Sequence, residues 1–410
     1  MRKFFTKPGS RKIYFFLLVV FLWIAADTIF AYTLPVIVED RFDDLALVGL
    51  LISLGAVVGI VVDLLAGSKL VGSNYSFFII SGLVTSLLVA VLYRFEHPVF
   101  SVLMIFTGGV YSELLNFGRE GFLSKEFKKE EHTKMAGLLV MVGSVAALGV
   151  PLFVTDAIEK ASFHVPFIMF AVLMLLALVT FVFLKPKPEE QKKVKFLHPI
   201  SIVTELKIWE KLSEKTAYIL VMMIMVSVID AVFWTTGALL AIELISQNEA
   251  AKFLIPVFIL PGLFAPFYTP KLSKLFGEKR ALILSFMLMG GFLIGFNFTD
   301  NVFVILILTA LSSTFISSTY TLIEGTLAHL INRLREDGNH MISLRGMTAD
   351  IGYIIGPILA GLIASQLGLK EGYVVIGILI VLIGIVLMIF TQRDIRLPRK
   401  EIDCLENEAG

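Results

Sequence analysis

Twelve long apolar stretches dominate this 410-residue sequence. Each reaches the length of about 20 residues that a helix needs to cross the hydrocarbon core of a bilayer. The stretches cover residues 13–38, 45–66, 75–93, 98–118, 135–154, 163–184, 216–245, 252–269, 279–298, 301–325, 342–366 and 371–391. Only 17% of the residues are charged, compared with about 25% in soluble domains. The sequence therefore predicts an all-α membrane protein with 12 transmembrane helices, and it argues against a soluble enzyme or a disordered chain.

The basic residues indicate the orientation of these helices. If the N-terminus is cytoplasmic and the spans alternate, the external loops hold few of the 35 Lys and Arg residues. Those in external loops are Arg41, Arg94, Lys160, Lys252 and Lys370. Cytoplasmic loops of membrane proteins are enriched in Lys and Arg. We therefore expect both termini to be cytoplasmic, and the near-neutral net charge of +1 argues against a nucleic-acid partner.

The two halves of the chain resemble each other weakly but in the same order. Four features recur at nearly one spacing: Asp27 and Asp230, Ser68–Gly72 and Ser273–Gly277, Glu120 and Glu324, and Pro151 and Pro357. An even number of spans in each copy keeps the copies in the same orientation, as in parallel transporter repeats. The sequence thus predicts two parallel six-helix repeats.

This duplication divides the chain into four parts. We expect an N-terminal bundle (1–184), a cytosolic linker (185–215), a C-terminal bundle (216–391) and a cytosolic tail (392–410). The second part of the linker has apolar residues at helical spacing, so it is either an interfacial helix or a solvated segment.

The whole-chain pattern resembles the major facilitator superfamily. The family's motif between spans two and three corresponds here to Gly67–Asn74, where Lys69 and Leu70 replace its Asp-Arg pair and Gly72 is kept. A second copy keeps Gly277 and Arg280. Span eleven, with Gly352, Gly356 and Pro357, is similar to the family's antiporter-associated pattern. The resemblance implies that these residues serve in gating, because such residues thin or bend a helix. Asp63, near the cytosolic end of span two, is a further gating candidate.

Acidic residues inside the spans are the main candidates for function. Asp27 and Asp230 fall near the middle of spans one and seven, where transporters place substrate and ion sites. A carboxylate there is costly unless it is paired, hydrated or protonated. Burial favours its neutral form, so it can exchange a proton near neutral pH. The alternative is a structural carboxyl group that binds a neighbouring hydroxyl.

Two further acidic residues are secondary candidates for proton coupling or substrate binding. Glu113 has Tyr111 and Asn116 nearby in span four, and Glu324 follows a hydroxyl-rich run that includes Tyr320 in span ten. Such hydroxyl groups either join helices or line an aqueous path. We assign Tyr111, Asn116 and Tyr320 to a substrate cavity.

Two tryptophans flank the central aspartates. Trp23 lies four residues before Asp27, and Trp234 lies four residues after Asp230. Residues four apart share a helix face, and a carboxylate beside an indole suits an organic cation. The alternative is that both rings only pack or face lipid. No Lys or Arg lies deep in the predicted spans, which argues against a carrier of phosphate or dicarboxylates.

The sequence has no metal-ligand cluster, nucleotide-binding loop or nucleophile–base motif. We predict no cofactor, no metal and no enzymatic activity. We expect a secondary transporter with a small-molecule substrate, protons and the lipid bilayer as its partners. It would be a monomer and a multi-pass protein of the cytoplasmic membrane if the source is prokaryotic.

The predicted activity is proton-coupled export of a lipophilic neutral or cationic compound, with two bundles rocking around a central cavity. Export follows from a resemblance to the drug:proton antiporter branch. One alternative is a proton-coupled importer of a neutral nutrient or metabolite. Another is a membrane receptor or assembly factor that uses a transporter scaffold without transporting.

Overall fold

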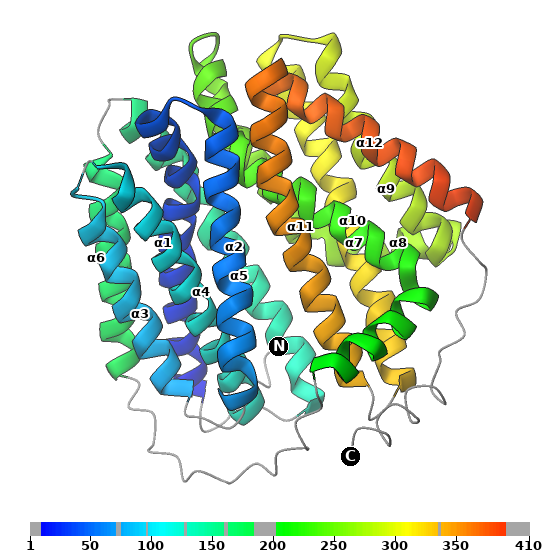
Figure 1. Cartoon of the computed structure of the whole chain (residues 1–410), viewed down its shortest axis with the longest axis horizontal. Coiled ribbons are helices and arrows are strands. Elements are labelled where there is room, and N and C mark those ends of the chain that lie inside the picture. Colours follow the sequence, from blue (N-terminus) through cyan, green and yellow to red (C-terminus); the bar gives the residue numbers. More distant parts are fainter. Residues whose placement is uncertain are drawn as a thin grey trace. The chain divides into compact units, whose positions relative to one another are not determined.

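The computed structural model describes residues 10–70, 75–95, 97–126, 129–159, 163–183, 202–334 and 338–390. These ranges fold into 12 long α-helices and two short 3-10 helices (Figure 1). The helices are α1 Ser10–Phe42, α2 Leu45–Leu70, α3 Tyr75–Leu92, α4 Pro98–Glu126, α5 Lys129–Glu159, α6 His164–Phe183, α7 Ile202–Ile245, η1 Glu249–Phe253, α8 Leu254–Phe276, α9 Glu278–Ile294, η2 Gly295–Phe298, α10 Val302–Leu334, α11 Gly338–Leu367 and α12 Leu369–Phe390. The predicted all-α fold is confirmed, and each of the 12 helices is long and apolar enough to cross a membrane.

Several helices extend beyond the predicted spans. The longest is α7, with 44 residues, and it begins at Ile202, inside the segment 185–215 that we assigned to the linker. Its first turns are well packed, because Ile208 and Leu212 are both fully buried. Residues 184–201 and 391–410 lie outside the described part of the chain.

Short polar residues define several helix ends. The Asp44 carboxylate accepts a hydrogen bond from the Ala46 amide at 2.8 Å where α2 begins. The side chain of Asn248 accepts from Ala250 N at 2.9 Å, and that of Asn301 accepts from Phe303 N at 2.9 Å. Such side chains satisfy amide groups that have no partner within the first helical turn. They separate the apolar spans at the loops that the sequence indicated.

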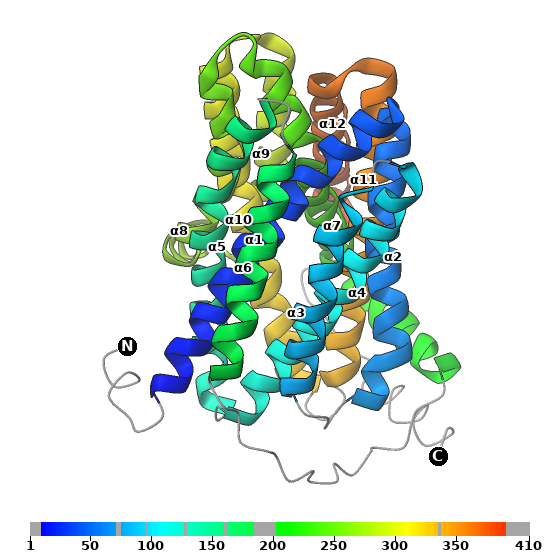
Figure 2. The same cartoon turned by 90° about the vertical axis from the view of Figure 1, so that its left-hand side faces the viewer.

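The chain divides into two compact units. Unit 1 comprises 1–194 and 237–263, and unit 2 comprises 195–236 and 264–410. In unit 1, α1 packs against α5 and α6, while α3 packs against α4 (Figure 2). The Phe16 and Phe122 rings stack in its core with centroids 3.5 Å apart. The Tyr32 hydroxyl is 2.7 Å from the Thr155 hydroxyl, which links α1 to α5.

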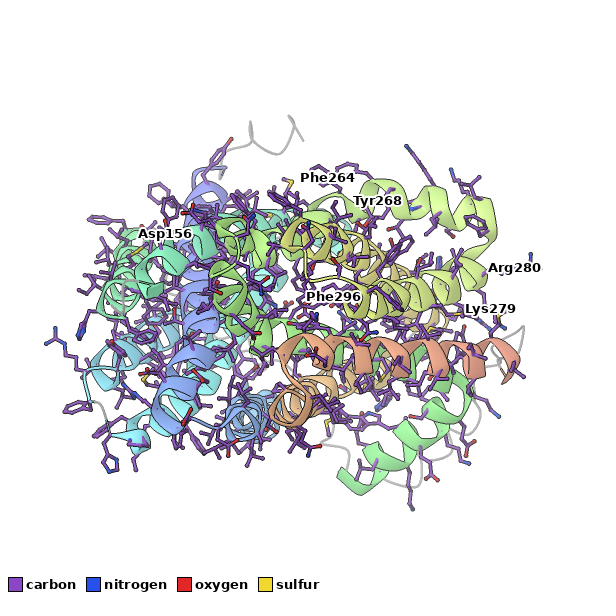
Figure 3. The ribbon with its side chains drawn as sticks, turned by 90° about the horizontal axis from the view of Figure 1, so that it is seen from above. Asp156, Phe264, Tyr268, Lys279, Arg280 and Phe296 are labelled. Carbon is purple, nitrogen blue, oxygen red and sulfur yellow. The ribbon has the colours of Figure 1, made fainter. Side chains whose placement is uncertain are left out.

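In unit 2, α9 packs against both α10 and α12. A Cβ atom on Gly290 of α9 would lie 2.7 Å from the Gly377 carbonyl oxygen of α12. The two backbones can approach this closely only because neither residue has a side chain. The rings of Phe233, Phe296 and Tyr373 gather beside this contact. Phe296, which is labelled in Figure 3, is fully buried.

An ion pair at one end of unit 2 joins the loop before α10 to the start of α12. The Lys370 ammonium group pairs with the Asp300 carboxylate and also donates to the Thr299 carbonyl oxygen at 3.4 Å. The Asp300 side chain is 85% exposed, so solvent screens this attraction. We expect Lys370→Gln to change the free energy of unfolding by less than about 1 kcal/mol. Thermal unfolding of the purified protein would test this, and a large loss of stability would contradict it.

Candidate functional site

Asp27 is the central carboxylate of unit 1. Its Oδ1 accepts a hydrogen bond from the Tyr111 hydroxyl of α4 at 2.7 Å. Tyr111 is almost fully buried, and its ring packs against Phe30 and Phe170. These contacts hold the hydroxyl group in place toward α1. The structure therefore brings together two residues that the sequence had placed in separate roles, one as a proton site and one in the cavity.

Tyr111→Phe would remove this hydrogen bond and keep the ring. We expect a loss of about 1 kcal/mol in stability, since interhelical hydrogen bonds in membranes are modest. The double variant Asp27→Ala/Tyr111→Phe would separate this bond from other effects, because removing both partners of a bond costs less than leaving one unsatisfied. Thermal unfolding in detergent measures both. A double variant that loses the sum of the two single effects would contradict a direct coupling.

The other candidates of unit 1 have different neighbours. A Cβ atom on Gly59 of α2 would lie 3.3 Å from the Glu113 carboxylate, so Glu113 faces α2. Tyr111, two residues earlier, faces α1. Asn116 is partly exposed. Trp23 is only 6% exposed, so its ring packs inside unit 1.

Asp230 is the central carboxylate of unit 2. Its Oδ2 accepts a hydrogen bond from the Tyr353 hydroxyl of α11 at 2.5 Å. Trp234, one helical turn further along α7, is partly exposed. We did not single out Tyr353 from the sequence. The available signal was its position inside the Gly352–Pro357 pattern, directly after a glycine.

The repeat predicted equivalent carboxylates, but their tyrosine partners are not equivalent. Tyr111 belongs to the fourth helix of its half, whereas Tyr353 belongs to the fifth helix of the other half. Asp27 and Asp230 thus each accept a hydrogen bond from a tyrosine, but the two tyrosines come from helices that are not equivalent in the repeat.

Glu324 has a charged partner that the sequence did not suggest. Its Oε1 accepts hydrogen bonds from Nε and Nη2 of Arg345, both at 2.8 Å. We had counted Arg345 with the cytosolic segments, but it lies in the second turn of α11, inside a candidate membrane span. Tyr320, one turn before Glu324 on α10, is 44% exposed and its hydroxyl is hydrogen-bonded to the same guanidinium group.

The hydroxyl-rich run before Glu324 mostly binds its own helix. The hydroxyl groups of Thr314, Ser318 and Thr319 each donate to the carbonyl oxygen four residues earlier. Ser312 is different, because it donates to the Met289 carbonyl oxygen of α9 at 2.9 Å. The Ser312 hydroxyl group therefore joins α10 to α9, while those of Thr314, Ser318 and Thr319 bind within α10.

The gating candidates in α11 make close contact with α7. A Cβ atom on Gly352 would lie 2.4 Å from Ser227 Cβ, and one on Gly356 would lie 2.7 Å from both Ala231 Cβ and the Val228 carbonyl oxygen. Pro357 lies within the continuous helix α11. The backbones of α7 and α11 thus meet directly beside Asp230 and Tyr353.

The other gating candidates lie at the ends of helices. Gly277 has a φ of 80° and connects α8 to α9, a conformation that favours glycine. Arg280 is exposed at the start of α9, next to Lys279 (Figure 3). Gly72 lies outside the described residues, as do the side chains of Asp63 and Lys69.

Metal-binding groups are absent from the described residues, since no cluster of three or more His, Cys, Asp or Glu side chains has suitable geometry. Asp27 and Asp230 are instead bound to hydroxyl groups, and Glu324 is bound to a guanidinium group. Such an arrangement can exchange protons or bind a polar ligand.

Comparison with known proteins defines the family. The chain matches the family model of the Major Facilitator Superfamily over residues 16–246 and 219–403. It therefore belongs to the Major Facilitator Superfamily, and it is a multi-pass secondary transporter rather than an enzyme. A search of curated protein sequences returned no match to this chain.

Solved structures with the same fold include several different transporters. The nucleoside transporter NupG has a TM-score of 0.72 and 12% identity, covering 92% of this chain and 98% of its own. A bacterial homologue of the human lysosomal transporter Spinster has a TM-score of 0.69 and 12% identity, covering 93% and 96%. The fucose:proton symporter FucP of E. coli has a TM-score of 0.57 and 16% identity, covering 93% and 99%. At these identities the likeness concerns the fold alone.

Proposed function

We propose that this transporter is proton-coupled and that Asp27 and Asp230 are its proton sites. The observation that carries the proposal is the pairing of each carboxylate. Each accepts a hydrogen bond from one tyrosine hydroxyl, and neither has a Lys or Arg partner within the described ranges. A hydroxyl group can bind a carboxyl group in either protonation state. Asp27 and Asp230 can therefore gain and lose a proton without breaking an ion pair.

Glu113 and Glu324 have secondary roles in this proposal. Glu324 forms an ion pair with Arg345, whereas Asp230 is bound by a neutral hydroxyl group, so we retain Glu324 as a secondary candidate. Glu113 is placed against the small residue Gly59, which leaves room for a carboxyl group between α2 and α4. We retain Glu113 as an additional proton-coupling residue of unit 1.

For the substrate we propose a lipophilic neutral or cationic small molecule that is exported in exchange for protons. The partly exposed Trp234 and the negative charge available at Asp230 support this chemistry. Tyr320 is exposed and serves as a polar contact. The similarity of Gly352–Pro357 to the pattern of the drug:proton antiporter branch supports export.

Import of a neutral nutrient is the second candidate. Similar solved structures include a nucleoside transporter, a peptide transporter and a fucose:proton symporter. A substrate with several hydroxyl or amide groups would find donors and acceptors in the Tyr320, Tyr353 and Arg345 side chains of unit 2.

The remaining predictions belong to the same proposal. We propose that the six-helix halves 1–184 and 216–391 are the units that move during alternating access, that both termini are cytoplasmic, and that the protein acts as a monomer. Gly352, Gly356 and Pro357 serve as gating residues because they let α11 pack closely on α7.

The test begins with a search for ligands. Compounds that bind the folded state raise its melting temperature whatever the direction of transport, so a thermal-shift screen of lipophilic cations, nucleosides, sugars and dipeptides identifies a substrate. Uptake of the hit into everted vesicles with an acidic interior, compared with a collapsed pH gradient, then separates export from import. Transport that is insensitive to the gradient would refute proton coupling.

A receptor or assembly factor on the same scaffold would give a different result. Its function would not need titrating carboxylates, so it would survive Asp27→Asn/Asp230→Asn, whereas transport would not.

A further inference from the structure

The ion pair between Glu324 and Arg345 lies within the candidate membrane spans of unit 2. Glu324 belongs to the span Val302–Ile331 of α10, and Arg345 belongs to the span His340–Leu367 of α11. Their side chains are nevertheless 29% and 36% exposed. Ionisable side chains within membrane helices face the interior of a bundle or a water-filled cavity rather than lipid. The exposed parts of this pair are therefore open to a polar ligand.

The geometry of the pair leaves part of each side chain unused. Nε and Nη2 of Arg345 both donate to the same atom, Oε1 of Glu324, at 2.8 Å. A guanidinium group carries five N–H donors, and its strongest pairing with a carboxylate uses two parallel bonds to the two oxygens. Oε2 of Glu324 takes no part in the two bonds to Arg345. Arg345 can therefore pair in a better geometry with the carboxylate of a ligand.

Charge balance decides which ligand can enter this site. Removing one partner of an ion pair away from water is costly, because the other charge is left uncompensated. An anion bound to Arg345 would leave Glu324 unpaired, and a cation bound to Glu324 would leave Arg345 unpaired. A zwitterion avoids both costs, because its carboxylate pairs with the guanidinium group while its ammonium group pairs with the released carboxylate of Glu324. Since the two side chains are in direct contact, the two charged groups of such a ligand must be close together.

We propose that the Glu324–Arg345 pair binds the charged groups of a zwitterionic substrate, such as an α-amino acid with an apolar side chain. Arg345 receives the carboxylate, and Glu324 receives the ammonium group. Tyr320, one turn before Glu324 on α10 and 44% exposed, borders the same site. The inference rests on the proposed function, and it narrows the neutral substrates proposed there to zwitterions.

Three probes of similar shape test the inference on the purified full-length protein. L-Phenylalanine is the zwitterion, 2-phenylethylamine has only the ammonium group, and 3-phenylpropionate has only the carboxylate. Dissociation constants follow from the dependence of the melting temperature on the concentration of each probe. In the wild type we expect phenylalanine to bind at least about tenfold more tightly than either analogue, because each analogue leaves one charge of the site without its charged hydrogen bond.

Charge variants of the pair should change this preference in opposite directions. In E324Q only the cation remains, so 3-phenylpropionate should bind at least as tightly as phenylalanine. In R345Q only the carboxylate remains, so 2-phenylethylamine should bind at least as tightly as phenylalanine. In E324Q/R345Q both charges are gone, and the three probes should bind alike. E324A and R345M carry the same charge changes and replace the glutamine variants if those do not fold.

The matched control is D300N/K370Q, which neutralises another ion pair of unit 2 and should keep the wild-type order of the three probes. An ion pair with only a structural role would lower the melting temperature of its variants without changing that order. Equal affinities in the wild type, or an order that is the same in E324Q and R345Q, would overturn the zwitterion site.

Failure of the proposed function would give a different result. Proton-coupled transport of another compound from the ligand screen, without the expected preference among the three probes, would overturn this inference and leave the proposed function standing. Preferential binding of phenylalanine that changes as expected in the variants, without any proton-coupled transport, would support the site and refute the proposed function.

Discussion

Asp230→Asn is expected to abolish substrate-driven proton movement. The amide keeps the size of the side chain and can still accept a hydrogen bond from Tyr353, but it cannot release a proton near neutral pH. The measurement is proton flux into proteoliposomes on addition of the substrate found by thermal shift. We expect flux at the level of protein-free liposomes.

The control for this prediction is Asp300→Asn, which removes a carboxylate of the same unit that pairs with Lys370 at a helix end. It should leave the flux unchanged. Asp27→Asn provides the comparison with unit 1, where the tyrosine donor comes from a different helix. Normal proton flux in Asp230→Asn would remove Asp230 from the mechanism.

Gly352→Ala is expected to have the second large effect. Its new Cβ atom would lie 2.4 Å from Ser227 Cβ and 2.7 Å from the Ile224 carbonyl oxygen, both closer than real contacts allow. Helices α7 and α11 would have to separate, and overpacking of this kind costs about 1–3 kcal/mol. Because Asp230 and Tyr353 bridge the same two helices, we expect transport to fall together with the melting temperature.

Gly346→Ala is the matched control on the same helix. A Cβ atom there would meet nothing within 4 Å, and alanine favours a helix over glycine by about 1 kcal/mol. Its melting temperature should be equal to or above that of the wild type. If both alanine variants had the same melting temperature, close packing against α7 would not explain why residue 352 is a glycine.

The fold was predictable because it depends on composition over long windows. A stretch such as 371–391, with almost no charge, has one stable arrangement in a bilayer, a helix that satisfies its own backbone. The ends of helices were less predictable. The start of α7 at Ile202 is amphipathic rather than apolar, and its place in the helix depends on tertiary packing of Ile208 and Leu212.

The candidate site was predictable only in its carboxylates. Asp27 and Asp230 stand out because charge is rare within an apolar span. Tyr111 was named as a cavity residue and Tyr353 was not, and the bond of either hydroxyl group to an aspartate becomes apparent only when another helix is placed beside it. Arg345 was counted with the cytosolic segments although it falls at the beginning of the predicted span 342–366, because the sequence does not show that Glu324 is its neighbour.

The sequence alone therefore determined the class of protein, the number of spans and the two acidic residues that a bilayer makes costly. These features follow from the energy of transferring each residue into hydrocarbon, which depends on the residue itself. The tertiary structure decided which hydroxyl binds each carboxylate, that Glu324 is paired with Arg345, and that Gly352 and Gly356 face α7. Those contacts join residues far apart in the chain, and they depend on the rotation and register of whole helices, which no local pattern specifies.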